Sequence, residues 1–201
     1  MGKLITVIGP SGVGKTALVH ALAKAGDFAI AFEQHEERPF QKLFKQDARY
    51  GLANQIDYFL LRAEQEQTLR VAPQIGLIDG GLDLDYHGFA RLFHSRGLLT
   101  GPEFELCGRL YETLRGLMPS PELIVRLRAD QATVAGRLSA RERINIASAE
   151  DFALFESFLD EWLVTMDRVY ILEVDVTEND PGYTWLVPFL MSDILDRFGK
   201  I

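Results

Sequence analysis

Residues 9–16 carry the clearest chemical signal in the sequence. They fit the phosphate-loop pattern G-x-x-x-x-G-K-[ST] in full, between a short apolar run and a helix-like pattern. Glycines let backbone N–H groups turn toward phosphate oxygens, and the start of the following helix adds further N–H donors. Lys15 would place a positive charge at the outer phosphates, and the Thr16 hydroxyl could ligate magnesium. The residues expected to hold a nucleotide are Gly9, Ser11, Gly12, Val13, Gly14, Lys15 and Thr16.

Glu33 and Asp79 are acidic residues that each directly follow a short apolar, strand-like run, 28–32 and 75–78 respectively. In an open parallel sheet, ligands bind beyond the carboxyl ends of the strands, so both side chains are expected near the phosphate loop. We predict that Glu33 accepts the proton of a hydroxyl acceptor and that Asp79 holds magnesium with Thr16. The alternative is that both acids are solvated turn residues.

Gln55 and Arg62 form a polar pair on a helix predicted over 48–70. They are seven residues apart, which is two helical turns, so they share one face of the helix. Glutamine can bind the edge of a base with two hydrogen bonds, and arginine can donate beside it. We predict a substrate-binding pair, and a solvated helix face is the alternative.

Arg137, Arg141 and Arg143 cluster near the end of a short helix predicted over 131–141. Arginines at this spacing could close over phosphates and stabilise charge on the transferred group. The alternative is the ordinary preference for basic residues at a helix C-terminus. We predict that Arg137 contacts the nucleotide and that Arg141 and Arg143 act in catalysis, on a short lid near 137–150.

The elements that must position these residues alternate along a chain of 201 residues, 47% hydrophobic and 25% charged, as is typical of globular domains. The predicted strands are 4–8, 28–32, 75–78, 123–127 and 169–174. The predicted helices are 15–25, 48–70, 85–94, 103–117, 131–141, 152–166 and 181–198. Strands separated by helices imply parallel pairing. We expect an α/β fold of the P-loop NTPase type, in three layers, with a five-stranded parallel sheet and helices on both faces, in a single domain over 1–201.

Charge and composition narrow the expected partners and compartment. Lys and Arg total 21 and Asp and Glu total 29, for a net charge of −8. Such an acidic chain argues against binding to a nucleic acid polymer or an anionic membrane. No apolar run approaches the roughly 20 residues that a spanning helix needs. The one cysteine, Cys107, cannot form an intrachain disulfide, so we expect a cytoplasmic location.

The N-K-x-D pattern typical of guanine recognition does not occur in the sequence, which disfavours a GTPase. A chain of this length with one sheet leaves little room for the modules of motors or ring-forming ATPases. The size therefore favours a small-molecule kinase that uses ATP and Mg²⁺.

Four segments resemble those of one kinase family. Segment 33–40 is similar to its E-P-V-x-x-N-P-F motif, and 78–85 is similar to its acid-Arg-Ser/Thr motif with a second Asp six positions on. Segment 121–129 is similar to its P-D-x-x-x-Y-L-x-A strand, and 137–143 matches its R-x-x-x-R-x-R lid. From about residue 3 to 176, the chain resembles the deoxyribonucleoside kinase family, nearest to the bacterial deoxyadenosine/deoxyguanosine kinase branch.

The resemblance implies an activity and a set of roles. It implies transfer of a phosphoryl group from ATP to the 5′-hydroxyl of a (deoxy)nucleoside, giving the 5′-monophosphate. By the same likeness, Glu33 would be the catalytic base, and Gln55 and Arg62 would read the base of the substrate. Asp85 would join Arg62 there. A homodimer built on helices is also implied.

The chain departs from the family pattern at several positions. Gly80 and Gly81 stand where the family has Arg and Ser/Thr. Phe44 replaces a tyrosine that contacts the sugar 3′-hydroxyl, and a lid glutamate aligns with Asn145 or Ile146. Two alternatives therefore stay open: another small-molecule or nucleotide kinase of the P-loop superfamily, or a catalytically impaired nucleotide-binding protein, which Gly80 favours.

Overall fold

Five parallel strands form the central sheet of the computed structural model, which describes residues 2–31, 38–139, 151–167, 169–178 and 182–199. The strands are β1 (Leu4–Ile8), β2 (Phe28–Ala31), β3 (Ile75–Asp79), β4 (Leu123–Arg128) and β5 (Tyr170–Asp175). Their order across the sheet is β2-β3-β1-β4-β5, and every neighbouring pair is parallel. The predicted five-stranded parallel sheet is confirmed.

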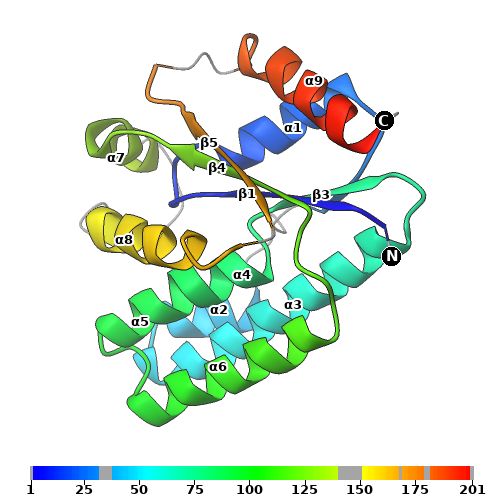
Figure 1. Ribbon diagram of the computed structural model, residues 1–201. Helices are drawn as coiled ribbons and strands as arrows, with labels where there is room; N and C mark the ends of the chain where they lie inside the picture. The colour runs from blue at the N-terminus through cyan, green and yellow to red at the C-terminus, as the bar shows by residue number, and fades with distance from the viewer. Residues whose placement is uncertain (1, 32–37, 140–150, 168, 179–181, 200–201) are drawn as a thin grey trace.

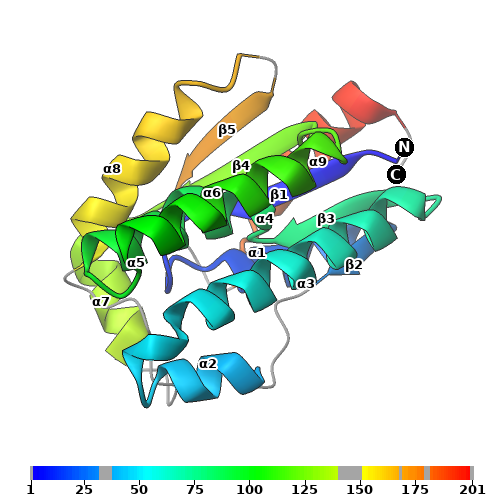
Figure 2. The same cartoon turned by 90° about the horizontal axis from the view of Figure 1, so that it is seen from below.

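Helices cover both faces of the sheet, as Figures 1 and 2 show. One face packs against α1 (Lys15–Ala25), α7 (Gln131–Ser139) and α9 (Leu186–Phe198). The other face carries α3 (Gly51–Val71), α4 (Leu82–Leu84), α5 (Arg91–Ser95), α6 (Gly101–Gly116) and α8 (Phe152–Leu163). A π-helical segment over Asp85–Ala90 joins α4 to α5. The expected three-layer α/β fold is therefore confirmed.

The strands at the centre are buried along their whole length because both of their faces are covered. All five residues of β1 and all five of β3 are buried. Short continuous apolar runs are typical of strands that helices cover on both sides. None of the helices in the described part of the chain combines the length and the apolar character needed to cross a bilayer.

Two helical segments differ from the sequence prediction. The short helix α2 (Pro39–Phe44) was not predicted, because six residues with one buried side chain show no clear periodicity. Helix α9 begins at Leu186 rather than at 181. Pro188 lies in its first turn, where a missing N–H costs no intrahelical bond, so this proline starts the helix and does not kink it.

The register of the sheet decides which residues meet at its carboxyl edge. Val7 of β1 lies opposite Asp79 of β3, so the loop that follows β1 starts beside Asp79. Ala31 of β2 lies opposite Ile78 on the other side of β3. The chain therefore leaves β1, β2 and β3 at neighbouring points of one edge.

Candidate active site

The phosphate loop joins β1 to α1. Its backbone is left-handed at Gly9, Gly12 and Gly14, with φ angles of 141°, 85° and 114°. These are conformations that residues with a Cβ rarely adopt. The glycines of the motif therefore give the loop a shape that other residues would strain.

Lys15 and Thr16 lie at the first turn of α1, inside the loop. The Lys15 ammonium donates to the carbonyl oxygens of Gly9 and Pro10, both at 3.0 Å, so its charge is held over the loop backbone. The Thr16 hydroxyl donates to Asp79 Oδ2 at 2.5 Å. This hydrogen bond joins the phosphate loop to the end of β3.

Asp79 fits the magnesium role that the sequence predicts for it. Its side chain is 1% exposed, and among the described residues its Oδ1 atom has no hydrogen-bond partner. A buried carboxylate is costly unless a cation or donors satisfy it. Mg²⁺ takes oxygen ligands and often binds through one or two protein groups plus substrate phosphates. Thr16 and Asp79 supply such a set, and no cluster of three or more acidic, Cys or His ligands occurs within the described ranges.

Arg137 lies beside the phosphate loop, and its predicted contact with the nucleotide stays a prediction. Its guanidinium donates to the carbonyl oxygens of Val13 at 2.8 Å and of Val176 at 3.0 Å. It thus joins the loop to the segment that follows β5. The other two arginines of the cluster, Arg141 and Arg143, lie outside the described residues.

Glu33 also lies outside the described residues, as do Asn145 and Ile146. The end of β2 at Ala31 places the chain at the carboxyl edge, beside β3, two residues before Glu33. The role of Glu33 as the catalytic base stays a prediction.

Gln55, Arg62 and Asp85 come together near Gly80, the residue after β3, and all three are buried. Arg62 Nε donates to Asp85 Oδ2 at 3.1 Å, and Gln55 Nε2 donates to the Asp85 backbone oxygen at 2.9 Å. The face of α3 that carries Gln55 and Arg62 is therefore buried. Both side chains bind Asp85, which begins the π-helical segment. Whether these side chains read a base stays a prediction.

Phe44 lies at the end of α2, where it is buried in an apolar cluster. Its ring packs edge-on against Phe93, with centroids 5.2 Å apart and planes at 67°. Whether Phe44 also lies against the sugar of a substrate stays a prediction.

Gly80 and Gly81 are left-handed, with φ angles of 86° and 113°. A Cβ at Gly80 would lie 3.2 Å from Arg62 Nη2, which is tighter than ordinary packing. At both positions where the chain departs from the family's Arg-Ser/Thr pair, the backbone therefore has a conformation that favours glycine.

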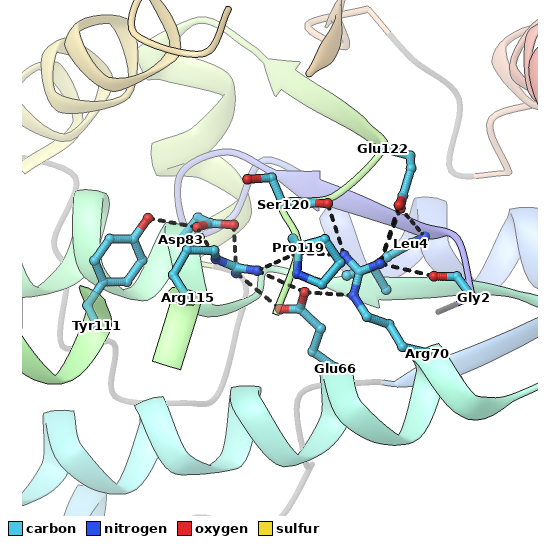
Figure 3. A network of polar contacts seen from close by, with 10 residues as sticks. All are labelled: Gly2, Leu4, Glu66, Arg70, Asp83, Tyr111, Arg115, Pro119, Ser120 and Glu122. Atoms are coloured by element: carbon cyan, nitrogen blue, oxygen red, sulfur yellow. Dashed lines mark hydrogen bonds and ion pairs between the residues drawn. The ribbon is translucent and has the colours of Figure 1, made fainter. Parts of the chain in front are cut away.

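A buried charge network supports this region, and Figure 3 shows it from close by. Arg115 of α6 donates to both oxygens of Asp83 and both oxygens of Glu66, at 2.9 to 3.1 Å. Burial alone would lower the pKa of the Arg115 guanidinium, but Asp83 and Glu66 raise it above its ordinary value. Asp83 is two residues before Asp85, so the network fixes the turn that carries Asp85 against α3 and α6.

Arg70 extends the network to the start of the chain. It donates to Glu66 at 3.1 Å and to the backbone oxygens of Gly2, Pro119 and Ser120 at 2.8 to 3.0 Å (Figure 3). Sequence reasoning missed this network. A signal was present, because Arg62, Glu66 and Arg70 recur every four residues on one face of α3.

His87 lies at the far end of the same network. Its ring stacks on Trp162, with centroids 4.9 Å apart and planes at 5°. The Tyr111 hydroxyl donates to Asp83 Oδ1 at 2.8 Å, so its oxygen is left to accept from His87 Nε2 at 3.1 Å. This network assigns the neutral Nε2–H tautomer to His87.

Acid is expected to destabilise the protein through His87. Burial, helped by Arg91 and Arg115, lowers the pKa of His87 to about 4 from an ordinary 6.5. The stability tied to neutral His87 is complete above pH 6.5 and is lost as the pH falls toward 4, by about 3 kcal/mol. The free energy of unfolding, measured from pH 7 to 4, should fall less steeply in His87→Gln. His20→Gln is the control, because His20 is exposed on α1. Equal slopes of unfolding free energy against pH in His87→Gln and the wild type would contradict the assignment.

The glycine-rich loop leads from the central strand of a parallel sheet into a helix, and an acid ends the neighbouring strand of the sheet. These features define the P-loop class of nucleotide-binding proteins. Solved structures of a deoxyadenosine kinase from M. mycoides, with dATP bound or with the products dCMP and dCDP bound, share this fold. Each has a TM-score of 0.79, at 19% and 18% identity. The matches cover 94% and 96% of this chain, and 98% and 99% of those chains.

The family model for deoxynucleoside kinases matches residues 5–181. The chain belongs to the deoxynucleoside kinase family. It is 26% identical over 144 residues to a deoxyadenosine/deoxycytidine kinase of Bacillus subtilis and 28% identical over 143 residues to a deoxyadenosine kinase of Dictyostelium discoideum. These regions cover 70% and 71% of this chain, but only 66% and 58% of the two relatives.

Proposed function

We propose that this protein transfers the outer phosphoryl group of ATP to the 5′-hydroxyl of a deoxynucleoside. The observation that carries the proposal is the junction at the end of β3. Asp79 accepts a hydrogen bond from Thr16 of the phosphate loop, and the next residue, Gly80, lies against Arg62 of the buried polar group. A site for phosphates and a site able to bind a base are therefore adjacent, as phosphoryl transfer between two bound substrates requires.

Each side chain is assigned one role in this proposal. The loop N–H groups and Lys15 bind the phosphates of the donor. Gln55, Arg62 and Asp85 offer donors and an acceptor to the edge of a base. Glu33, which follows β2, accepts the proton of the 5′-hydroxyl as the nucleophile attacks. Thr16 and Asp79 hold Mg²⁺, which neutralises charge on the phosphate oxygens when it is bound.

Arg137, Arg141 and Arg143 complete the donor side of the proposed site. Arg137 is already held against the loop through Val13. Arg141 and Arg143 follow it along the chain by four and six residues, and we assign them to the charge that develops on the transferring group. In this proposal residues 137–150 act as the lid of a single kinase domain.

The names of the relatives guide the choice of the nucleoside acceptor. Their names include deoxyadenosine, deoxycytidine and deoxyguanosine kinases, so a deoxynucleoside is the first acceptor to test.

We also propose a cytoplasmic homodimer that forms through α3 and α6. Leu60 of α3 and Leu106 of α6 are apolar side chains exposed on these two packed helices.

A coupled assay of ADP formation tests the proposal. ATP, Mg²⁺ and the protein are incubated in turn with deoxynucleosides, ribonucleosides and nucleoside monophosphates. Turnover with at least one deoxynucleoside is expected. Turnover with monophosphates alone would favour another nucleotide kinase. Clear ATP binding without any turnover would favour the impaired nucleotide-binding protein, the alternative that Gly80 supports.

Weak discrimination is expected between a 2′-deoxynucleoside and its 2′,3′-dideoxy analogue. Phe44 has no hydroxyl to meet the 3′-oxygen, and Ile146, if it is the residue that aligns with the lid glutamate, has no acceptor for it. A site without polar groups leaves nothing unpaired when the hydroxyl is missing, so kcat/KM should differ by less than about thirtyfold. The two values are compared at saturating ATP. A preference above about a thousandfold would mean that another residue binds the 3′-hydroxyl.

A further inference from the structure

Tyr183 reaches the phosphate loop from the segment between β5 and α9. With φ of 52°, it is the only residue other than glycine with a positive φ in the described part of the chain. Its side chain is buried, at 1% exposure, and its hydroxyl donates to the Gly14 carbonyl oxygen at 3.1 Å. A left-handed backbone is unfavourable for a residue with a Cβ, so the surrounding packing must hold Tyr183 in place.

The contact depends on the absence of a side chain at Gly14. A Cβ there would lie 2.1 Å from the Tyr183 hydroxyl oxygen, a distance that no packing allows. Gly14 is also left-handed, with φ of 114°. The last glycine of the loop thus leaves room for the hydroxyl of Tyr183 as well as shaping the loop itself.

Two carbonyl groups of the loop accept hydrogen bonds from donors that lie outside it. The Gly14 oxygen accepts from the Leu18 N–H at 3.1 Å and from the Tyr183 hydroxyl, and the Val13 oxygen accepts from Arg137 at 2.8 Å. In a trans peptide the C=O and the following N–H point in opposite directions. Fixing these oxygens therefore aims the N–H groups of Gly14 and Lys15 away from the donors and into the loop.

We propose that Tyr183 is a positioning residue of the phosphate loop, whose hydroxyl holds the Gly14–Lys15 peptide group in the orientation that binds phosphate oxygens. The inference rests on the proposed binding of ATP at this loop. It gives the segment after β5 a part in that binding, although this segment is about 170 residues away along the chain. The same segment is tied to the loop a second time, through the bonds of Arg137 to Val13 and Val176.

Tyr183→Phe tests the proposal, because it removes the hydroxyl and keeps the buried ring. Tyr170→Phe is the matched control. Tyr170 is the first residue of β5, so it lies at the amino ends of the strands, whereas the phosphate loop lies at their carboxyl ends. The dissociation constants of ATP and of inorganic tripolyphosphate, with Mg²⁺ present, are measured by calorimetry for the three proteins. Thermal unfolding midpoints and the KM values for ATP and the nucleoside are measured alongside.

In Tyr183→Phe, both dissociation constants and the KM for ATP should rise about fivefold, which is the worth of one net hydrogen bond, while the KM for the nucleoside stays constant. Tyr170→Phe should bind both phosphate compounds as the wild type does. Binding by Tyr183→Phe within about twofold of the wild type, or equal weakening in both variants, would overturn the proposal. A wild type that binds neither compound would overturn the proposed function and, with it, this inference.

Discussion

Glu33→Gln is expected to lower kcat by about 10² to 10⁴-fold, which is the usual contribution of a positioned general base. The amide is nearly isosteric with the carboxylate but cannot take the proton of the 5′-hydroxyl. Folding and the binding of ATP and nucleoside should therefore be preserved. Steady-state kinetics with ATP and the best deoxynucleoside, together with binding measurements, separate the two effects.

Glu36→Gln and Glu37→Gln are matched controls, because they make the same change in the same segment of the sequence. Both variants should keep kcat close to that of the wild type. If Glu33→Gln also keeps its turnover within about fivefold, Glu33 is not the base, and Asp79 becomes the candidate.

Lys15→Ala is expected to weaken ATP binding and to reduce kcat by at least about 10² to 10³-fold. The ammonium is held over the loop by two carbonyl oxygens at 3.0 Å, where the proposed function places the outer phosphates of the donor. Removing one preorganised donor from a site of charge development costs a factor of this size, and each charge-assisted hydrogen bond contributes about 1.5 to 3 kcal/mol to binding.

The control for this prediction is Lys24→Ala, which removes an exposed lysine from the last turn of the same helix. It should bind ATP and turn over as the wild type does. An ATP affinity that stays within about twofold in Lys15→Ala would contradict the role given to this lysine.

The sheet and the phosphate loop could be predicted because their signals are local. Each strand is a short apolar run, and the loop is a contiguous motif that must lie between a strand and a helix. The parallel order then brings Asp79 beside Thr16, since ligands gather at the carboxyl ends of such strands. The grouping of Gln55 with Arg62 also followed from helical spacing alone.

The contacts that could not be predicted join segments that are far apart in the sequence. Arg115 meets Glu66 and Asp83 across 49 and 32 residues, and no spacing rule indicates which acid an arginine will choose. Tyr183 meets Gly14 across 169 residues. Its left-handed backbone has no sequence signal, because tyrosine is a poor residue for that conformation.

The two left-handed glycines after Asp79 constrain how this chain can change over evolution. Arginine placed at position 80 alone would meet both an unfavourable φ and the guanidinium of Arg62 at close range. A change to the Arg-Ser/Thr pair of the family motif, made one residue at a time, would therefore pass through a strained intermediate. Positions 80 and 81 should change together with the backbone, and what position 80 tolerates should depend on the residue at position 62.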